Sequence, residues 1–126
     1  YKRQALYPFL SDYRRAWDMD RDVIVYNGLN YYTRWFDPEG KRLTEFFTKL
    51  GYIDVQNFVE RITCPVLFGT GLMDEICPPS SQFAVFSKIR APKQHLIFPE
   101  FGHEEIAAFD DKLIAFFGEE AVVCQE

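Results

Sequence analysis

Residues 66–104 decide the fold, because two apolar runs in this stretch have the pattern of strands. Each run also leads to a residue type used in acid–base catalysis. The first run is Val66-Leu67-Phe68-Gly69-Thr70-Gly71, and the loop after it contains Asp74. The second run is Leu96-Ile97-Phe98-Pro99, and the loop after it contains His103. Short runs that are apolar on both faces are typical of buried parallel strands. We therefore predict two parallel strands, with Asp74 and His103 at their carboxyl ends.

Apolar residues recur at helical spacing in four segments around these strands, namely 43–50, 55–62, 78–89 and 106–117. The first two segments each have one apolar stripe, and we expect both to lie against the sheet. The third begins at Pro78-Pro79, where proline fits a first helical turn. Its inward face is predicted to consist of Phe83, Ala84, Phe86 and Ile89. Helices that alternate with strands in this way predict an α/β fold, with parallel strands flanked by helices.

The N-terminal part of the chain is rich in aromatic residues. The run 7–10 contains a proline and is predicted to be a strand end or a loop that crosses the end of the sheet. Ser11-Asp12 is a helix cap for a short helix, and the length of segment 23–36 favours a second helix. The aromatic residues of that helix either pack onto the domain or another subunit, or form a platform for sugar rings; they are Tyr26, Tyr31, Tyr32 and Trp35.

Composition excludes several classes of function. A chain of 126 residues that is 48% hydrophobic can build one folded domain. Its net charge of -5, without a basic run, argues against a nucleic-acid partner. We find no signal-peptide pattern, and no run of about eighteen apolar residues that would span a membrane. Cys64, Cys77 and Cys124 have irregular spacing, so we interpret them as reduced thiols and expect a cytoplasmic protein.

The positions of Asp74 and His103 allow two interpretations. Catalytic groups of open α/β sheets gather beyond the carboxyl ends of strands, and a carboxylate can orient an imidazole that acts as a base. The order Asp before His also agrees with the Ser, Asp, His order of α/β-hydrolases. Alternatively, Asp74 stabilises a turn, and His103 caps the last helix or lies exposed at its start. His95 lies inside a strand pattern and is interpreted as structural.

Longer motifs make the first interpretation more specific. One is Gly71-Leu72-Met73-Asp74-Glu75-Ile76-Cys77-Pro78-Pro79-Ser80-Ser81-Gln82-Phe83-Ala84, and another is Phe101-Gly102-His103-Glu104. Three more occur in the right order: Tyr7-Pro8-Phe9-Leu10-Ser11-Asp12, Gly51-Tyr52-Ile53-Asp54 and Cys64-Pro65-Val66-Leu67. With these motifs the chain closely resembles the C-terminal portion of the acetyl xylan esterase and cephalosporin C deacetylase family of α/β-hydrolases, over nearly its whole length.

The resemblance implies that residues 1–126 are the C-terminal portion of a single α/β-hydrolase domain. It implies that Asp74 is the acid and His103 the general base of a Ser-Asp-His triad that removes acetyl groups from acetylated sugars or related small acetate esters. No metal and no organic cofactor are implied. The family's serine lies upstream in a Gly-x-Ser-x-Gly elbow, and the four serines of this chain have no such setting; they are Ser11, Ser80, Ser81 and Ser87.

We therefore expect the 126-residue chain alone to be inactive. A truncated sheet would expose an unpaired edge, so we also expect a homo-oligomer or association through the truncated face. Two alternatives to an acetylesterase remain. One is another α/β-hydrolase activity, a peptidase or a carboxylesterase for longer acyl chains, because Asp and His serve these reactions equally. The other is a non-catalytic carbohydrate-binding or interaction module that uses Tyr31, Tyr32 and Trp35.

Overall fold

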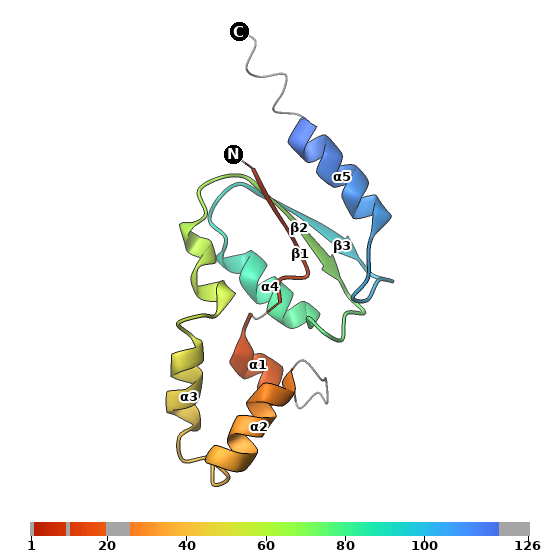
Figure 1. The fold of residues 1–126 in the computed structure, drawn as a ribbon. Coiled ribbons are helices and arrows are strands. Elements are labelled where there is room, and N and C mark those ends of the chain that lie inside the picture. The colour runs from red at the N-terminus through yellow and green to blue at the C-terminus, as the bar shows by residue number, and fades with distance from the viewer. Residues whose placement is uncertain (1, 10, 20–25, 119–126) are drawn as a thin grey trace.

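The computed structural model describes residues 2–9, 11–19 and 26–118 of the chain. Their centre is a parallel sheet with the strand order β1 (Arg3–Leu6), β2 (Val66–Gly71) and β3 (Lys93–Phe98) (Figure 1). The two predicted strands, β2 and β3, are confirmed. Sequence reasoning missed β1, whose four residues lack an apolar pattern and become a strand by pairing with β2. Tyr7 follows β1 directly, so the predicted strand end at residues 7–10 is confirmed for the described residues.

Helices cover both faces of the sheet. Successive side chains of a strand point to opposite faces, and β2 is buried along its whole length. Phe68 packs toward Val85 and Ile89 from α4 (Pro79–Lys88) and its C-cap, whereas Leu67 belongs to a second cluster with Phe109 from α5 (Ala107–Gly118). The predicted α/β architecture, with parallel strands flanked by helices, is therefore confirmed.

Three further helices form a group away from the sheet (Figure 1): α1 (Tyr13–Asp18), α2 (Asn27–Phe36) and α3 (Leu43–Leu50). The predicted cap of α1 is confirmed, since the Asp12 side chain accepts a hydrogen bond from the Arg15 amide. The expectation that segment 43–50 lies against the sheet is wrong. Phe46 stacks on Tyr32 at a ring distance of 4.2 Å and Phe47 packs on Trp17, so α3 buries its apolar stripe against α2 and α1.

Segment 55–62 also differs from its prediction. Instead of one α-helix it forms two 3₁₀ turns, η2 (Val55–Asn57) and η3 (Val59–Arg61). These turns pack on α4, where Val59 is buried. Asp54 caps the first of these turns, because its side chain accepts a hydrogen bond from the Gln56 amide.

The aromatic residues of α2 and its N-terminal end divide into two groups. Tyr26 is buried and donates its hydroxyl hydrogen bond to the Ile76 carbonyl, and Tyr32 stacks on α3. Tyr31 and Trp35 are 60% and 65% exposed. Packing therefore explains the first pair but leaves the second pair on the surface. Residues 23–25 of the predicted segment lie outside the described residues.

The described cysteines, Cys64 and Cys77, are free thiols, as predicted, and Cys77 is buried. Cys124 lies outside the described residues. No helix in the described part of the chain has both the length and the apolar character needed to cross a membrane.

Candidate active site

The loops after β2 and β3 are joined at the carboxyl edge of the sheet. The Leu72 amide donates to the Phe98 carbonyl over 3.1 Å, and the Met73 amide donates to the Phe101 carbonyl over 3.0 Å. Gly71 makes this approach possible, because a Cβ atom there would lie 2.6 Å from the Phe101 carbonyl oxygen. Any larger residue would push the second loop away from the first. A glycine at the end of β2 therefore brings the two loops together.

Asp74 lies in the first of these loops with its side chain fully buried. Its Oδ1 accepts hydrogen bonds from the amides of Ile76 and Cys77 over 2.9 and 2.8 Å. Its Oδ2 accepts from Gln82 Nε2 over 3.2 Å and is 3.0 Å from His103 Nδ1. A buried carboxylate is stable only when its oxygens are hydrogen-bonded in this way. The backbone bonds fix the carboxylate, and Oδ2 faces the histidine.

His103 lies in the second loop, and its side chain is 36% exposed. Because the carboxylate of Asp74 can only accept, the proton of the bond between the two residues lies on Nδ1. Nε2 is then the ring nitrogen with a free lone pair, and it makes no hydrogen bond to any described residue. Such an imidazole is oriented by an acid on one side and can take up a proton on the other.

Tyr7 supports the imidazole from the end of β1. Its ring centre lies 5.0 Å from that of His103, and its backbone has φ = 51°, a left-handed conformation that is unusual for a tyrosine. Its buried hydroxyl makes no hydrogen bond of standard geometry within the described residues, although it interacts with the Glu104 backbone, which acts to lower its pKa. Burial, and then the charge of Asp74, raise the pKa of Tyr7, so the phenol is neutral at physiological pH. Tyr7 thus contributes an apolar surface with one polar atom that lacks a standard hydrogen bond.

Asp74, Cys77 and His103 together offer three atoms within 4.8 Å of one another that could ligate a metal. The hydrogen bonds of these residues explain their arrangement without a metal ion. The Cys77 thiol donates toward the Tyr7 carbonyl over 3.6 Å, and burial raises the pKa of Cys77 to about 12, with a further contribution from Asp74. Metals bind the thiolate, and both Asp74 oxygens already accept two hydrogen bonds each. The donor set fits an acid–base pair better than a metal centre.

The other predicted residues lie apart from the pair. His95 binds Thr70 over 2.8 Å and stacks on Phe86, and burial lowers its pKa, which fits its structural interpretation. No serine hydroxyl is bonded to His103 in the described structure. The hydroxyls of Ser11 and Ser87 donate to backbone carbonyls, that of Ser80 contacts Met19, and that of Ser81 is unpaired.

Sequence reasoning missed Gln82 as a site residue. It predicted an inward face of α4 made of Phe83, Ala84, Phe86 and Ile89, whereas the buried residues of α4 are Ser81, Gln82 and Val85. Of the predicted face, Ile89 is buried and the others are half-buried. The one available signal was the position of Gln82 one turn after Pro78-Pro79, within the motif that contains Asp74.

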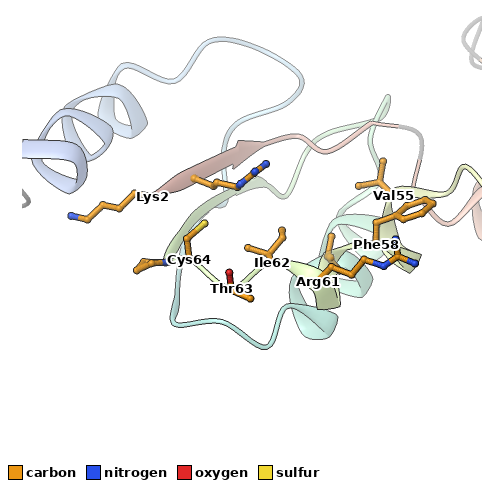
Figure 2. A pocket seen from close by; sticks show the side chains of 10 residues that line it. Lys2, Val55, Phe58, Arg61, Ile62, Thr63 and Cys64 are labelled. Carbon is orange, nitrogen blue, oxygen red and sulfur yellow. The ribbon is translucent and has the colours of Figure 1, made fainter.

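A large groove lies at the opposite end of the sheet (Figure 2). Arg3 and Pro65, at the amino ends of β1 and β2, line it together with apolar residues such as Phe58 and Ile62. A strand of six residues separates the two ends of the sheet by about 20 Å. The groove is therefore remote from Asp74 and His103. The hydrogen-bonded acid and base identify the candidate site better than the size of a cavity does.

A parallel sheet between helices, with an aspartate and a histidine hydrogen-bonded beyond its strand ends, defines an α/β-hydrolase. The chain belongs to the acetyl xylan esterase family, since the model of that family, Acetyl xylan esterase (AXE1), matches residues 1–120. Acetyl esterase Axe7A from Xylanibacter ruminicola is 43% identical over 95 residues, which are 75% of this chain and 20% of that protein.

Solved structures give the same assignment. Acetyl xylan esterase 1 from Thermoanaerobacterium sp. is 46% identical with a TM-score of 0.90, and the acetyl xylan esterase from Paenibacillus sp. R4 is 26% identical with a TM-score of 0.88. Each match covers 94% of this chain and 37% of the other. A puromycin hydrolase shares the fold at 22% identity and a TM-score of 0.62, over 93% of this chain and 18% of that one. The chain thus spans well under half the length of these relatives.

Proposed function

We propose that the protein carrying this chain hydrolyses acetyl esters, with Asp74 and His103 as the acid and base of a serine triad. The observation that carries the proposal is the 3.0 Å hydrogen bond between the buried Asp74 carboxylate and Nδ1 of His103, which leaves Nε2 available. The names of its relatives, acetyl xylan esterases and an acetyl esterase, support acetyl esters as the substrate class. We propose acetylated sugars or related small acetate esters as substrates.

In this proposal His103 moves one proton in each half of the reaction. Nε2 removes the proton of a serine hydroxyl as its oxygen attacks the acetyl carbonyl, and then gives that proton to the departing alcohol. Water enters the acetyl-enzyme by the same route, with Nε2 as base, and acetate leaves while serine regains its proton. Asp74 holds the ring in the Nδ1-protonated form and stabilises the imidazolium that forms twice per cycle.

We propose that the nucleophilic serine belongs to a part of the protein outside residues 1–126. None of the four serines of the chain is placed to serve His103, because three are engaged with other groups and Ser81 is buried in α4. The proposal agrees with the share of the solved relatives that this chain covers, 37% in each case. The 126-residue chain alone is then inactive, because the covalent route needs the serine.

The test compares the two histidines of the chain. In the full native chain that carries residues 1–126, His103→Ala lowers kcat on 4-nitrophenyl acetate by at least about 1000-fold. His95→Gln is the matched control and keeps a rate per folded molecule close to wild type, because His95 contacts Thr70 and Phe86 rather than Asp74.

Two results would contradict the proposal. If His103→Ala retains wild-type turnover, the pair is not the acid–base couple. If the 126-residue chain alone turns over the ester and loses that activity with His103→Ala, the serine lies within the chain after all.

A further inference from the structure

Gln82 is a polar residue in an unusually apolar position. It lies in the first turn of α4 and is 0% exposed, next to the loop that contains Asp74. A glutamine side chain carries two amide hydrogens and one oxygen, and burying these without partners costs stability. Its hydrogen bonds therefore show what holds it there.

Both described hydrogen bonds of Gln82 come from its amide nitrogen. Nε2 donates to Asp74 Oδ2 over 3.2 Å and to the Cys77 carbonyl over 2.5 Å. Since both partners can only accept, the amide group has one sensible orientation, with nitrogen toward Asp74. Gln82 thus links the Asp74 carboxylate to the Cys77 carbonyl in the same loop.

The amide oxygen of Gln82 has no hydrogen-bond partner among the described residues. An unpaired buried oxygen is unfavourable for folding, so stability alone would favour an apolar residue of similar size. An apolar residue could reproduce neither the bond to the Cys77 carbonyl nor the bond to Asp74 Oδ2. The second of these reaches the same oxygen that holds His103.

We propose that Gln82 is a positioning residue for the acid–base pair, which holds Asp74 Oδ2 toward His103 Nδ1. This inference rests on the proposed function. The amides of Ile76 and Cys77 fix Oδ1, and Gln82 is the second contact that fixes the rotation of the carboxylate. It has no direct contact with His103 and acts only through Asp74.

The test uses Gln82→Met in the full native chain, because methionine keeps the length of the side chain and removes the donor. We expect kcat on 4-nitrophenyl acetate to fall about 10-fold with little change in KM, the size of one lost charged hydrogen bond.

The chain offers a matched control in Gln56. Its Nε2 donates over 3.0 Å to another buried carboxylate, that of Asp54, and its oxygen accepts from Lys88. Gln56→Met removes the same kind of bond away from the site. Thermal stability is measured for both variants, and Gln56→Met leaves kcat per folded molecule unchanged.

Gln82→Glu provides a test that does not depend on the stability of the variant. On the acid side, a glutamic acid buried beside Asp74 is protonated and donates one hydrogen bond to it, so activity is retained there. At higher pH the new carboxyl ionises against Asp74, and activity falls on the alkaline side of the wild-type optimum.

The outcomes separate the two proposals. If His103→Ala keeps its activity, the proposed function fails. If His103→Ala is inactive while Gln82→Met keeps the kcat per folded molecule of Gln56→Met and of the wild type, Gln82 is only a packing residue. Where Gln82→Met does not fold, an unchanged alkaline side in Gln82→Glu overturns the inference and a fall there supports it.

Discussion

Asp54 and Asp74 are both buried, with exposures of 4% and 1%, and each accepts four hydrogen bonds. Three of the four donors are of the same kind at both sites, namely two backbone amides and a glutamine Nε2. The fourth donor differs. For Asp54 it is a third backbone amide, so that Asp12 and Tyr13 at the start of α1 both donate to it, whereas for Asp74 it is the ring of His103.

This difference separates a structural aspartate from a candidate catalytic one. All donors to Asp54 are groups that do not titrate between pH 5 and 8, so the carboxylate joins α1 to η2 and does nothing further. Asp74 accepts the same kinds of hydrogen bond from neighbouring residues, but its fourth bond is to His103, a base whose side chain remains 36% exposed. Burial and satisfied hydrogen bonds alone therefore do not mark a catalytic acid. The marker is a titratable partner with access to solvent.

Asparagine substitutions should break this comparison most strongly. In the full native chain, Asp74→Asn lowers kcat/KM on 4-nitrophenyl acetate by about 10,000-fold, because the amide favours the wrong tautomer of His103. Asp54→Asn keeps kcat/KM per folded molecule near the wild-type value. It lowers the free energy of unfolding by roughly 2 kcal/mol or more, since an amide nitrogen then faces donors. Urea unfolding gives the stability and steady-state kinetics the rate.

Two outcomes for these variants would contradict the distinction between Asp54 and Asp74. If Asp54→Asn loses activity to the same extent while it remains folded, the two aspartates are not distinct in the way their partners indicate. If Asp74→Asn loses only stability, the hydrogen bond to His103 is structural.

A tyrosine accompanies each aspartate and offers a second, smaller test. Burial and the nearby carboxylate raise the pKa of Tyr7 beside Asp74 and of Tyr13 beside Asp54. Only Tyr7 packs on a histidine, at a ring distance of 5.0 Å. We expect Tyr7→Leu to lower kcat about 10- to 100-fold by loosening the imidazole, and Tyr13→Leu to lower only the melting temperature.

Tyr7→Phe distinguishes the ring from the hydroxyl. It keeps the surface against His103 and removes a buried hydroxyl that makes no hydrogen bond of standard geometry in the described part of the chain. Activity should stay close to wild type, and stability should rise by up to about 1 kcal/mol. A large loss of activity would instead show that the hydroxyl binds a group outside the described residues.

The sequence predicted the part of this picture that depends on local pattern. Runs of six and four residues, 66–71 and 96–99, identified β2 and β3, because β2 is buried along its whole length and β3 pairs with it. Parallel strands that are neighbours end at one edge of the sheet, so the loops with Asp74 and His103 could be expected to meet. Their hydrogen bond follows from that topology.

The sequence did not predict which surface an amphipathic segment covers. Helical spacing showed that segment 43–50 has an apolar stripe, but Phe46 and Phe47 found the aromatic residues of α2 and α1 instead of the sheet. Periodicity indicates that one face of a helix is buried, but it does not indicate which part of the molecule covers that face.

Gln82 shows the same limit inside the site. An amide in a helix is normally assigned to the surface, and its burial makes sense only once the Asp74 carboxylate is known to lie 3.2 Å away. The left-handed backbone of Tyr7 is likewise a tertiary effect. Residues that serve a buried charge break the local rules on which sequence patterns depend.

The smallest expected effect concerns the electrostatic field of Asp74 on Cys77. Burial, and then this charge, raise the pKa of the thiol from about 9 to about 12 in the folded chain. Between these values the unfolded chain releases the proton first and binds fewer protons than the folded chain. Unfolding free energy is therefore fully retained below about pH 9 and declines as the pH rises toward 12.

Cys77→Ala should reduce this decline between pH 9 and 10, where the raised pKa values of Tyr7 and Tyr13 also contribute to it. Asp74→Asn should reduce the contribution of Cys77 in part, because it removes the second cause of the shift, and Asp54→Asn should leave that contribution unchanged. Urea unfolding at four or five pH values in this window measures the slope. If Cys77→Ala has the wild-type slope, the thiol does not report the charge of Asp74. The contrast between the two aspartates then rests on the rate measurements alone.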